Sequence, residues 1–309
     1  MSDVVIVGSM ALDSVQTPFG SADRVVGGAA TYASVAASLL AAPQVVGVVG
    51  ADFPQEALAL LAERGADLEG VERVPDAKSF YWSGVYDYDL AGRESLVTEL
   101  NVFAEFHPVL PERYRESRYC FLANIQPQVQ LAVLDQLNDA CFVMCDTMDY
   151  WIESEPAALA EVLGRVDLAL LNDSEVRQLA GTPNLGRAAE RVLEMGPRWV
   201  VVKKGEYGAT LVSDDDLFTV PSYPLPNVVD PTGAGDSFAG GMIGLLARED
   251  NCCNMNLRRA MASGTVIASA AIEGFSLGGL QRLDLAEIER RYETLREIVR
   301  FEALELQNL

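Results

Sequence analysis

The sequence predicts an α/β protein: a doubly wound, mainly parallel sheet flanked by helices, with a small second β-sheet standing off it. Three observations predict this class. Short apolar runs alternate with helical patterns along most of the chain. Half of the 309 residues are hydrophobic, which is enough to bury a substantial core. One aromatic segment, residues 79–101, breaks the alternation with a period of two and therefore predicts the small sheet.

The first fifty residues predict a strand, a helix and a second strand. Residues 4–8 read "VVIVG", a short apolar run bounded by glycine that is typical of a buried parallel strand. Residues 27–41 place small side chains at helical spacing, and residues 44–50 read "QVVGVVG". This order predicts a βαβ unit.

The same alternation continues to the end of the chain. Strands are expected at residues 119–124, 141–146, 168–172 and 198–205, followed by a hairpin over 208–222. Helices are expected near 55–64, 129–138, 157–163 and 185–195, with further helices closing the C-terminus. Because no internal repeat or low-complexity linker interrupts the pattern, we predict a single domain over residues 1–309.

Two chain segments depart from the alternation of strands and helices. Residues 79–101 alternate apolar and polar side chains around a Gly-Arg turn, which predicts an antiparallel hairpin with Arg93 at its tip. Residues 13–28 form a second excursion directly after the first strand. Together, residues of about 13–26 and 79–106 predict a lid at the carboxyl ends of the parallel strands, where open α/β sheets bind ligands. A plain edge hairpin or a dimer contact remains an alternative.

Composition limits the possible partners and the location. A formal net charge of −22 argues against a nucleic-acid or anionic-membrane partner, so an anionic ligand needs a local positive pocket. No basic leader and no run of about 20 apolar residues is seen, and a cytoplasmic location is expected. The five cysteines form no C-x-x-C pair and His107 is the single histidine, which disfavours a zinc site and predicts reduced core thiols and a surface His107.

Two familiar nucleotide-binding signatures are absent from the sequence. There is no G-x-x-x-x-G-K-[ST] loop and no G-x-G-x-x-G after the first strand. Any nucleotide site therefore has to be built from other residues.

The stretch "VVDPTGAGDSFAGG" at residues 228–241 carries the clearest chemistry. Gly233, Ala234 and Gly235 leave backbone N–H groups uncovered where an apolar helix begins, which predicts an anion site suited to a phosphoryl group. Asp236 in the first turn would face the same point and could accept a hydroxyl proton. A helix cap is the alternative role for this carboxylate, although a cap requires no such density of glycine.

At this stretch the chain resembles the ribokinase (PfkB) family of small-molecule kinases. "DPTGAGDSFAGG" is similar to the C-terminal signature of that family, and weaker landmarks occur in the family's order. These are "VIVGSMALD" ending at Asp13, "GGAATYAS" at 27–34, "GVVGADF" at 47–53, "NDSEVRQL" at 172–179 and "KKGEYGA" at 203–209. The resemblance covers nearly the whole chain and implies the ribokinase-like fold and phosphoryl transfer from ATP.

The resemblance assigns roles on the phosphate side. Asp236 would be the base that takes the proton from the acceptor hydroxyl, and the amides of residues 233–235 would form the anion hole. Asn172 and Glu175 match the N-x-x-E pattern that organises Mg²⁺ through waters. Considered alone, this Asn and Glu could equally be the cap and first-turn acid of the following helix.

The resemblance also implies an acceptor site and a nucleotide site. Asp13, expected at the end of the first strand, would bind acceptor hydroxyls, and Gly27 and Gly28 would let the backbone approach the acceptor. Thr31 and Tyr32 stand where sugar kinases often carry Asn, so the chain departs from the family at that acceptor contact, where Thr31 is the candidate substrate-binding residue. The residues implied along the nucleotide are Lys203, Gly205, Thr232, Gly233, Gly235, Ala262 and Ser263, with Asn172. Residues 262–276 correspond to the adenine pocket and to a loop that in many members binds K⁺, completed by Asp230.

The prediction of the acceptor rests on the aromatic residues of the lid, which are less specific than a motif. The lid contains Phe80, Trp82, Tyr86 and Tyr88, and residues 100–106 add Phe103 and Phe106, which predicts surfaces for stacking a nucleobase. We therefore expect a nucleoside such as adenosine, with a sugar or phosphosugar as the alternative acceptor. Aromatic packing at a hinge or dimer contact would explain the same residues. A non-catalytic nucleotide sensor or an unrelated binding module is a weaker alternative, and the chain is expected to be a monomer or a lid-mediated homodimer.

Overall fold

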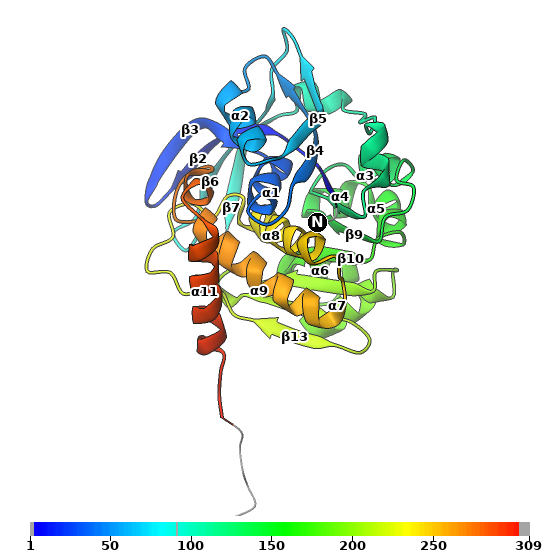
Figure 1. Cartoon of the computed structure of the whole chain (residues 1–309), viewed down its shortest axis with the longest axis vertical. Helices are drawn as coiled ribbons and strands as arrows, with labels where there is room; N and C mark the ends of the chain where they lie inside the picture. Colours follow the sequence, from blue (N-terminus) through cyan, green and yellow to red (C-terminus); the bar gives the residue numbers. More distant parts are fainter. Residues whose placement is uncertain (1–2, 91, 303–309) are drawn as a thin grey trace, which may run out of the picture.

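The large sheet contains nine strands within residues 3–90 and 92–302, which are the residues that the computed structural model describes. Its order is β13-β12-β11-β10-β9-β8-β1-β4-β5, and only β12 and β13 run antiparallel to their neighbours. The doubly wound, mainly parallel sheet is therefore confirmed (Figure 1). The strands are β1 (Val4–Val7), β4 (Pro43–Gly50), β5 (Asp67–Val74), β8 (Tyr119–Leu122), β9 (Phe142–Asp146), β10 (Leu168–Asn172), β11 (Trp199–Lys203), β12 (Ala209–Val212) and β13 (Leu217–Val220).

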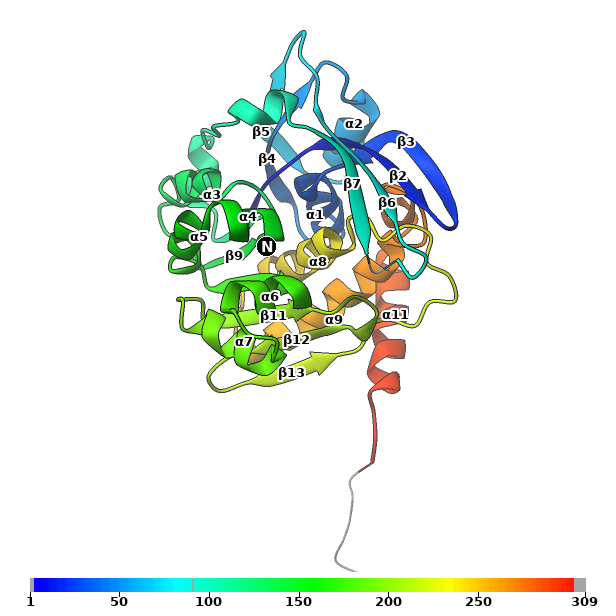
Figure 2. The same cartoon turned by 180° about the vertical axis from the view of Figure 1, so that it is seen from behind.

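Helices cover both faces of this sheet, as Figures 1 and 2 show from opposite sides. Side chains of β1 alternate between two separate hydrophobic clusters: Val4 and Ile6 join one, and Val5 and Val7 join the other. The first cluster is closed by α1 (Ala29–Ala37), α2 (Gln55–Glu63), α8 (Ala234–Glu249), α9 (Asn254–Ala271), α10 (Gly278–Gln281) and α11 (Leu285–Ile298). The second is closed by α3 (Pro127–Leu134), α4 (Asp149–Ser154), α5 (Pro156–Leu163), α6 (Asp173–Ala180) and α7 (Leu185–Leu193).

A second, four-stranded sheet, called the small sheet below, has the order β3-β2-β6-β7. It consists of β2 (Ala11–Thr17), β3 (Gly20–Gly27), β6 (Phe80–Tyr86) and β7 (Arg93–Glu99), with a 3₁₀ helix at Asn101–Glu105. The antiparallel hairpin predicted at residues 79–101 is present as β6–β7, and β2 pairs with β6 in parallel. Every residue of β7 is exposed, whereas the strands of the large sheet are mostly buried.

Several details of the sequence prediction were wrong. Asp13 does not end the first strand, because β1 stops at Val7 and Asp13 lies inside β2 of the small sheet. The strand β5 and the short helix α4 were not predicted, since the charged, half-exposed β5 segment "DLEGVERV" hides the apolar pattern of a strand. Cys120 and Cys145 are buried as expected.

Two of the other cysteines also depart from the prediction. Cys141 and Cys253 are exposed, and Cys252 is half-buried, because all three lie at the ends of elements and not in the core. His107 is exposed, as predicted. Within the described residues no helix is both long and apolar enough to cross a membrane.

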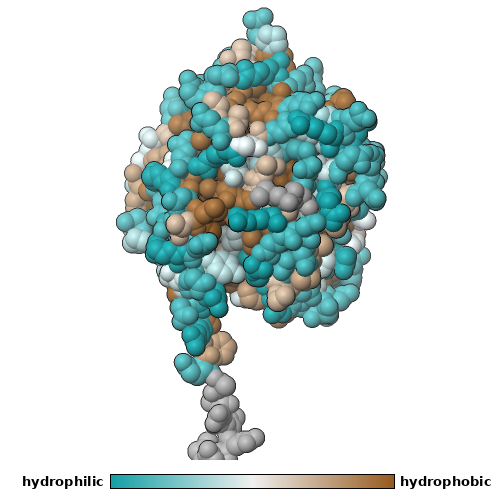
Figure 3. Space-filling model, in the orientation of Figure 1, coloured by the Kyte–Doolittle hydropathy of each residue, from teal (hydrophilic) through white to brown (hydrophobic). Residues whose placement is uncertain are grey.

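The surface agrees with the acidic composition. The face drawn in Figure 3 is mostly hydrophilic, and apolar side chains gather in a limited area near its middle. The helix α11 projects from this face as a polar element, since its outward side chains are mainly Glu and Arg.

Candidate active site

Three polar side chains end neighbouring strands at the carboxyl edge of the large sheet. Asp146 ends β9, Asn172 ends β10 and Lys203 ends β11, and Asn172 is in register with Lys203. The Lys203 ammonium donates to Asp146 Oδ2 at 2.5 Å, and the Asp146 side chain is buried. Burial alone would lower the pKa of Lys203, but the Asp146 and Glu175 carboxylates outweigh it and raise that pKa. Lys203 is thus held as a cation at this edge.

The glycine loop brings the N-terminus of α8 to the same place. Gly233 has φ of +76°, and a side chain there would come within 2.5 Å of the Tyr32 ring, so both backbone and space require glycine. A Cβ on Gly235 would lie 3.4 Å from Lys203 Nζ. The start of α8 and the Lys203 ammonium therefore converge on one point, which suits an anion.

The predicted anion hole differs in one detail. The N–H of Ala234 donates to the Pro231 carbonyl at 3.1 Å, so it is already used within the turn. In the described chain, the N–H groups of Gly233 and Gly235 have no such partner. The two glycine amides are the ones left to bind an anion, because the turn that exposes them consumes the amide between them.

Asp236 lies in the first turn of α8 and is half-buried. Burial and the nearby Asp146 carboxylate together raise the pKa of its carboxyl to about 6, although Lys203 and Arg93 oppose the rise. A pKa of about 6 leaves the group mostly ionised at neutral pH and still able to take a proton. This is the protonation behaviour that a general base needs.

Asp13 approaches from the small sheet. It pairs with Trp82 of β6, and its carboxylate packs so closely on Gly27 that no side chain fits there. Burial, with Asp230 and Asp236 nearby, raises the pKa of Asp13 to about 7. The predicted acceptor residues Asp13, Gly27 and Gly28 are therefore gathered on the side of Asp236 that faces the small sheet, since the N–H of Gly28 also bonds to Asp13.

Thr31 and Tyr32 occupy different environments, although both belong to α1. Thr31 is fully buried, and its Oγ1 has no hydrogen-bond partner among the described residues. Tyr32 packs beneath Gly233, and burial together with Asp13, Asp230 and Asp236 raises its pKa. Of the pair, Tyr32 is the residue that faces the carboxylates.

Asn172 and Glu175 form a capping box at the start of α6. Asn172 Oδ1 accepts from the N–H of Glu175 at 2.8 Å, and Glu175 Oε2 accepts from the N–H of Asn172 at 2.6 Å. Burial raises the pKa of Glu175 to about 7, against the pull of Lys203. The capping role that the sequence left open is present, and Glu175 also lies beside the Lys203–Asp146 pair.

The remaining predicted nucleotide residues lie along α8 and α9. Thr232 donates its N–H to Asp230 Oδ1 at 2.9 Å, and Asp230 is buried. The Asp230 carboxylate also accepts from the backbone of Ser276, which brings it to the loop that follows α9. Ser263 is buried in α9 and Ala262 is half-buried beside it. Gly205 has φ of +54° with open space where a Cβ would stand, so it borders a free surface.

Two residues near Asp236 were missed by sequence reasoning. Asp146 closes the strand "CFVMCD", and its position at the strand end was a usable signal because Lys203 and Asn172 end neighbouring strands. Arg93 was predicted only as the tip of the hairpin, yet it is the first residue of β7 and its charge lowers the pKa of both Asp236 and Asp13. No local sequence pattern indicates that placement, because it depends on how β7 pairs with β6.

The aromatic residues of the predicted lid divide into two groups. Phe80, Phe103 and Phe106 stack on one another, with centroid distances of 5.4 and 5.8 Å, so their faces are used in packing. Tyr88 is 91% exposed. Trp82 and Tyr86 remain beside the carboxylates, since Trp82 pairs with Asp13 and the Tyr86 hydroxyl accepts from Thr232 Oγ1 at 3.2 Å.

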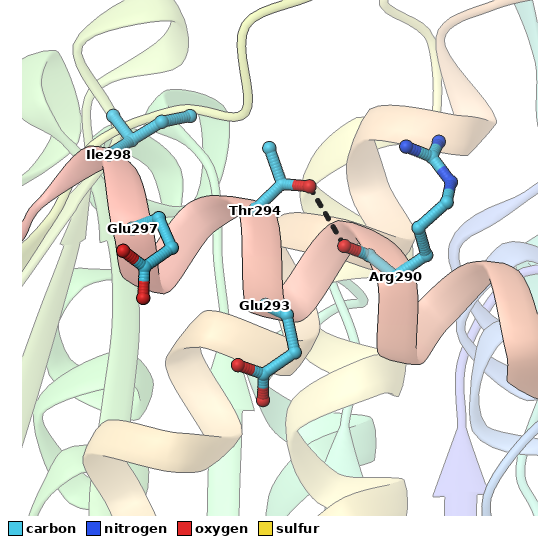
Figure 4. Close-up of a pocket in the computed structure, with 5 residues that line it drawn as sticks. All are labelled: Arg290, Glu293, Thr294, Glu297 and Ile298. Carbon is cyan, nitrogen blue, oxygen red and sulfur yellow. Dashed lines mark hydrogen bonds between the residues drawn. The ribbon is translucent and has the colours of Figure 1, made fainter.

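A surface hollow elsewhere has no part in this site. It is lined by Arg290, Glu293, Thr294, Glu297 and Ile298, which all belong to α11 (Figure 4). The interaction drawn there is a local helix contact, in which Thr294 Oγ1 donates to the Arg290 carbonyl at 2.9 Å. Because one helix alone lines it, the hollow has no facing wall to enclose a ligand.

Taken together, the fold and the gathered groups define a class of protein. A carboxylate at a helix N-terminus, two glycine amides without a backbone partner among the described residues, a half-buried lysine and a second carboxylate on a neighbouring sheet are parts that suit transfer of a phosphoryl group to a hydroxyl. The fold and site therefore define a small-molecule kinase.

Comparison with known proteins identifies the family. A family model described as pfkB family carbohydrate kinase matches residues 1–280, and the chain belongs to this family. A cytidine kinase of Thermococcus kodakarensis is 31% identical over 269 residues, covering 84% of this chain and 95% of that protein. A ribokinase of Lactococcus lactis is 26% identical, covering 96% and 98%.

Solved structures show the same fold. A nucleoside kinase of Burkholderia thailandensis in complex with inosine matches with a TM-score of 0.72 at 20% identity, covering 94% of this chain and 98% of that one. The nucleoside kinase of Methanocaldococcus jannaschii matches with a TM-score of 0.76 at 18% identity, covering 95% and 99%. The ribokinase-like fold is confirmed, and the chain is a phosphotransferase of the nucleoside and sugar kinase type. Membership in this kinase family implies use of ATP with a divalent cation.

Proposed function

We propose that the protein phosphorylates the 5′-hydroxyl, or hydroxymethyl group, of a nucleoside such as adenosine or cytidine, with ATP and Mg²⁺. The observation that carries the proposal is Asp236, which lies in the first turn of α8 beside the free amides of Gly233 and Gly235. The 31% identical relative is named a cytidine kinase, which supports a nucleoside acceptor. Trp82 and Tyr86 are the aromatic side chains placed to line the base or ribose.

In this proposal each of these residues has a defined role. Asp13 and the backbone at Gly27 and Gly28 bind the acceptor hydroxyls, and Asp236 takes the proton of the attacking hydroxyl. The amides of Gly233 and Gly235, with Lys203, hold the phosphoryl oxygens as charge develops on them. The small sheet acts as a lid that excludes water, so that transfer to the acceptor outcompetes hydrolysis.

The donor set fits the two cations that the family uses. Carboxylate and amide oxygens suit Mg²⁺, which keeps several waters, and Glu175 offers a buried carboxylate beside Asn172 even while both form the capping box. Mg²⁺ held there through water would neutralise the phosphates of ATP. Asp230, beside the loop at residues 262–276, is the group we propose for a monovalent cation such as K⁺.

The location and oligomeric state complete the proposal. We also propose a cytoplasmic location, because ATP and nucleosides are both available to such an enzyme there. The exposed edge strand β7 carries Leu96 and Val97, at 56% and 40% exposure, and can pair across a lid-mediated homodimer, with a monomer as the alternative.

A sugar or phosphosugar is the second candidate acceptor. The observation that favours it is Arg93, whose cation faces Asp13 and Asp236 from the small sheet. A phosphate carried by the acceptor itself would need such a cation. A non-catalytic nucleotide sensor would not need Asp13 and Asp236 to face each other.

The test is release of ADP from ATP and Mg²⁺ with purified protein against nucleosides, free sugars and phosphosugars, repeated with Asp236→Asn. We expect turnover on a nucleoside, and a loss of at least about 10²-fold in the variant, because the base is removed while the side-chain shape is kept. Circular dichroism and ATP binding serve as controls for folding. Turnover on sugars alone would refute the nucleoside acceptor, and unchanged turnover in Asp236→Asn would refute the base.

A further inference from the structure

Arg291 of α11 is a buried cation that binds the C-terminal end of α9. Its Nη1 donates to Ser269 Oγ at 2.9 Å and its Nη2 to Glu273 Oε2 at 2.7 Å. Its Nε donates to Glu287 Oε1 on its own helix at 2.7 Å. All three nitrogens of the guanidinium are therefore used, and two of them hold α11 against the end of α9, beside which it packs (Figure 1).

The end of α9 in turn holds the chain that leads into the glycine loop. The carbonyl of Ile272, the C-cap of α9, accepts from the N–H of Val229 at 2.8 Å and from that of Asp230 at 3.4 Å. This segment continues directly through Pro231 and Thr232 to Gly233. The proposed anion hole is therefore fastened to the end of α9 by backbone hydrogen bonds.

A further contact of Arg291 reaches the same segment nearer its start. The guanidinium carbon lies 5.3 Å from the centroid of the Tyr223 ring. Tyr223 is half-buried and packs against the first hydrophobic cluster. Arg291 thus binds the helix end on which residues 229 and 230 rest, and it also lies over the chain that leads to them.

The neighbouring residue Arg290 provides a contrast. Arg290 also binds Glu287, through Nε at 2.7 Å and Nη2 at 2.6 Å, but its side chain is 60% exposed. Among the described residues it makes no hydrogen bond to α9. The two arginines therefore share an ion pair within α11, and of the two only Arg291 connects this helix to the end of α9.

The charge of Arg291 suits its place. A cation is favoured at the C-terminal end of a helix such as α9. Burial alone would lower the pKa of Arg291, but its hydrogen bonds to Glu287 and Glu273 outweigh burial and raise that pKa. The Glu273 side chain is 33% exposed, so it can turn toward water if its partner is lost. Removal of Arg291 should therefore shift the end of α9 while leaving its fold in place.

We propose that Arg291 is a positioning residue for ATP binding: by holding the end of α9, it fixes residues 229–230 and, through them, the glycine amides that receive the ATP phosphates. This inference rests on the proposed function for the role of those amides. Arg291 acts through the backbone and is not itself a ligand of ATP. It also lies outside residues 1–280, which are the residues that the family model matches.

The test compares Arg291→Ala with Arg290→Ala as the matched control. Both variants remove an arginine that pairs with Glu287, so an effect of that pair should appear in both. Titration calorimetry with ATP and Mg²⁺, without an acceptor, gives the Kd of ATP, and ADP release gives the KM values. We expect the Kd and KM of ATP to rise by about tenfold in Arg291→Ala and by less than about twofold in Arg290→Ala, with the KM of the acceptor nearly unchanged.

Two milder variants keep the test decisive if Arg291→Ala does not fold. Arg291→Lys keeps the charge but cannot serve three acceptors from one planar fork, and Glu273→Gln keeps the shape of the side chain without its charge. Each should raise the Kd of ATP by about threefold. The double variant should raise it by less than the product of the two, because both changes disrupt one interaction.

The opposite results are equally clear. A lower melting temperature with an unchanged Kd of ATP in the folded variants would show that Arg291 only stabilises the fold. Equal shifts in Arg290→Ala would assign the effect to the Glu287 pair. A wild-type protein that binds ATP but turns over no acceptor would refute the proposed function, whereas the binding comparison would still decide the role of Arg291.

Discussion

The carboxyl edge of the large sheet and the small sheet meet at Asp236, and they differ in how fully their polar groups are bonded within the protein. At the large sheet, Lys203 is paired with Asp146, and Asn172 and Glu175 complete a capping box. On the small sheet, β7 is exposed throughout, and within residues 3–90 and 92–302 Arg93 forms no ion pair. In the proposed function, this difference means that the fold itself preforms the phosphate side, whereas the acceptor side would be completed by its ligand.

We expect the largest loss of activity from a change in the glycine loop, on the phosphate side of this comparison. We predict that Gly233→Ala lowers kcat by about 10²-fold or more, because the new Cβ meets the Tyr32 ring and the residue must keep φ of +76°. The measurement is ADP release together with thermal unfolding. Gly181→Ala is the matched control, since Gly181 also has a positive φ, +61°, but open space around it and a place at the far end of α6.

Gly181→Ala should lose about 1 kcal/mol of stability through the strained backbone, and Gly233→Ala should lose more because its Cβ also meets the Tyr32 ring. Only Gly233→Ala should lose turnover. If Gly181→Ala loses turnover to the same degree, the cost is a general one of backbone strain, and the preformed phosphate side is not the explanation.

A smaller effect is expected from the capping box of α6. We predict that Asn172→Ala lowers kcat by about 10-fold at limiting Mg²⁺ and that excess Mg²⁺ restores part of it, because the variant weakens the water-bound cation and not the base. The matched control is Asn184→Ala, which removes the N-cap of α7, where Asn184 Oδ1 accepts from the Arg187 N–H at 3.4 Å.

Loss of either cap should cost about 1 kcal/mol of stability. The dependence of the rate on Mg²⁺ should change in Asn172→Ala alone. An equal loss of activity at every Mg²⁺ concentration would mean that Asn172 is only a helix cap, which is the simpler role that its hydrogen bonds already show.

The two regions also differ in how much the sequence could predict. The glycine loop, the strand ends and the helix caps are set by residues adjacent in the chain, so Gly233, Asp236 and Asn172 were found from local pattern. The family resemblance supplied their roles. Asp146 could have been found in the same way, because it ends a strand next to those of Asn172 and Lys203.

The small sheet could be predicted only in outline. The period of two indicated the hairpin, but it did not indicate that β2 would pair with β6 and bring Asp13 beside Trp82. Nor did it show that Phe80, Phe103 and Phe106 stack on each other, which leaves Trp82 and Tyr86 for the site. These placements depend on cross-strand register between distant segments, and local spacing carries no information about it.

The smallest predicted effect, on pH dependence, separates the two carboxylates. Burial raises the pKa of Asp236 to about 6 and that of Asp13 to about 7, and both act as ionised groups in the proposed reaction. We therefore expect kcat/KM to fall as the pH drops through 7 and then 6, by about tenfold per pH unit for each group that must lose its proton. In Asp13→Asn, whose remaining activity should be low, only the fall near pH 6 should persist.

Stability should respond to pH in the opposite sense. Because the pKa of Asp13 is higher in the folded chain than the ordinary 3.8, its favourable contribution to folding exists at low pH and is lost as the pH rises through about 7. Asp13→Asn should therefore raise the melting temperature at pH 8 by a larger amount than at pH 5. A variant that melts no higher than wild type at pH 8 would show that Asp13 is already well solvated or paired. The small sheet would then be as fully bonded as the large one, and the contrast between them would fail.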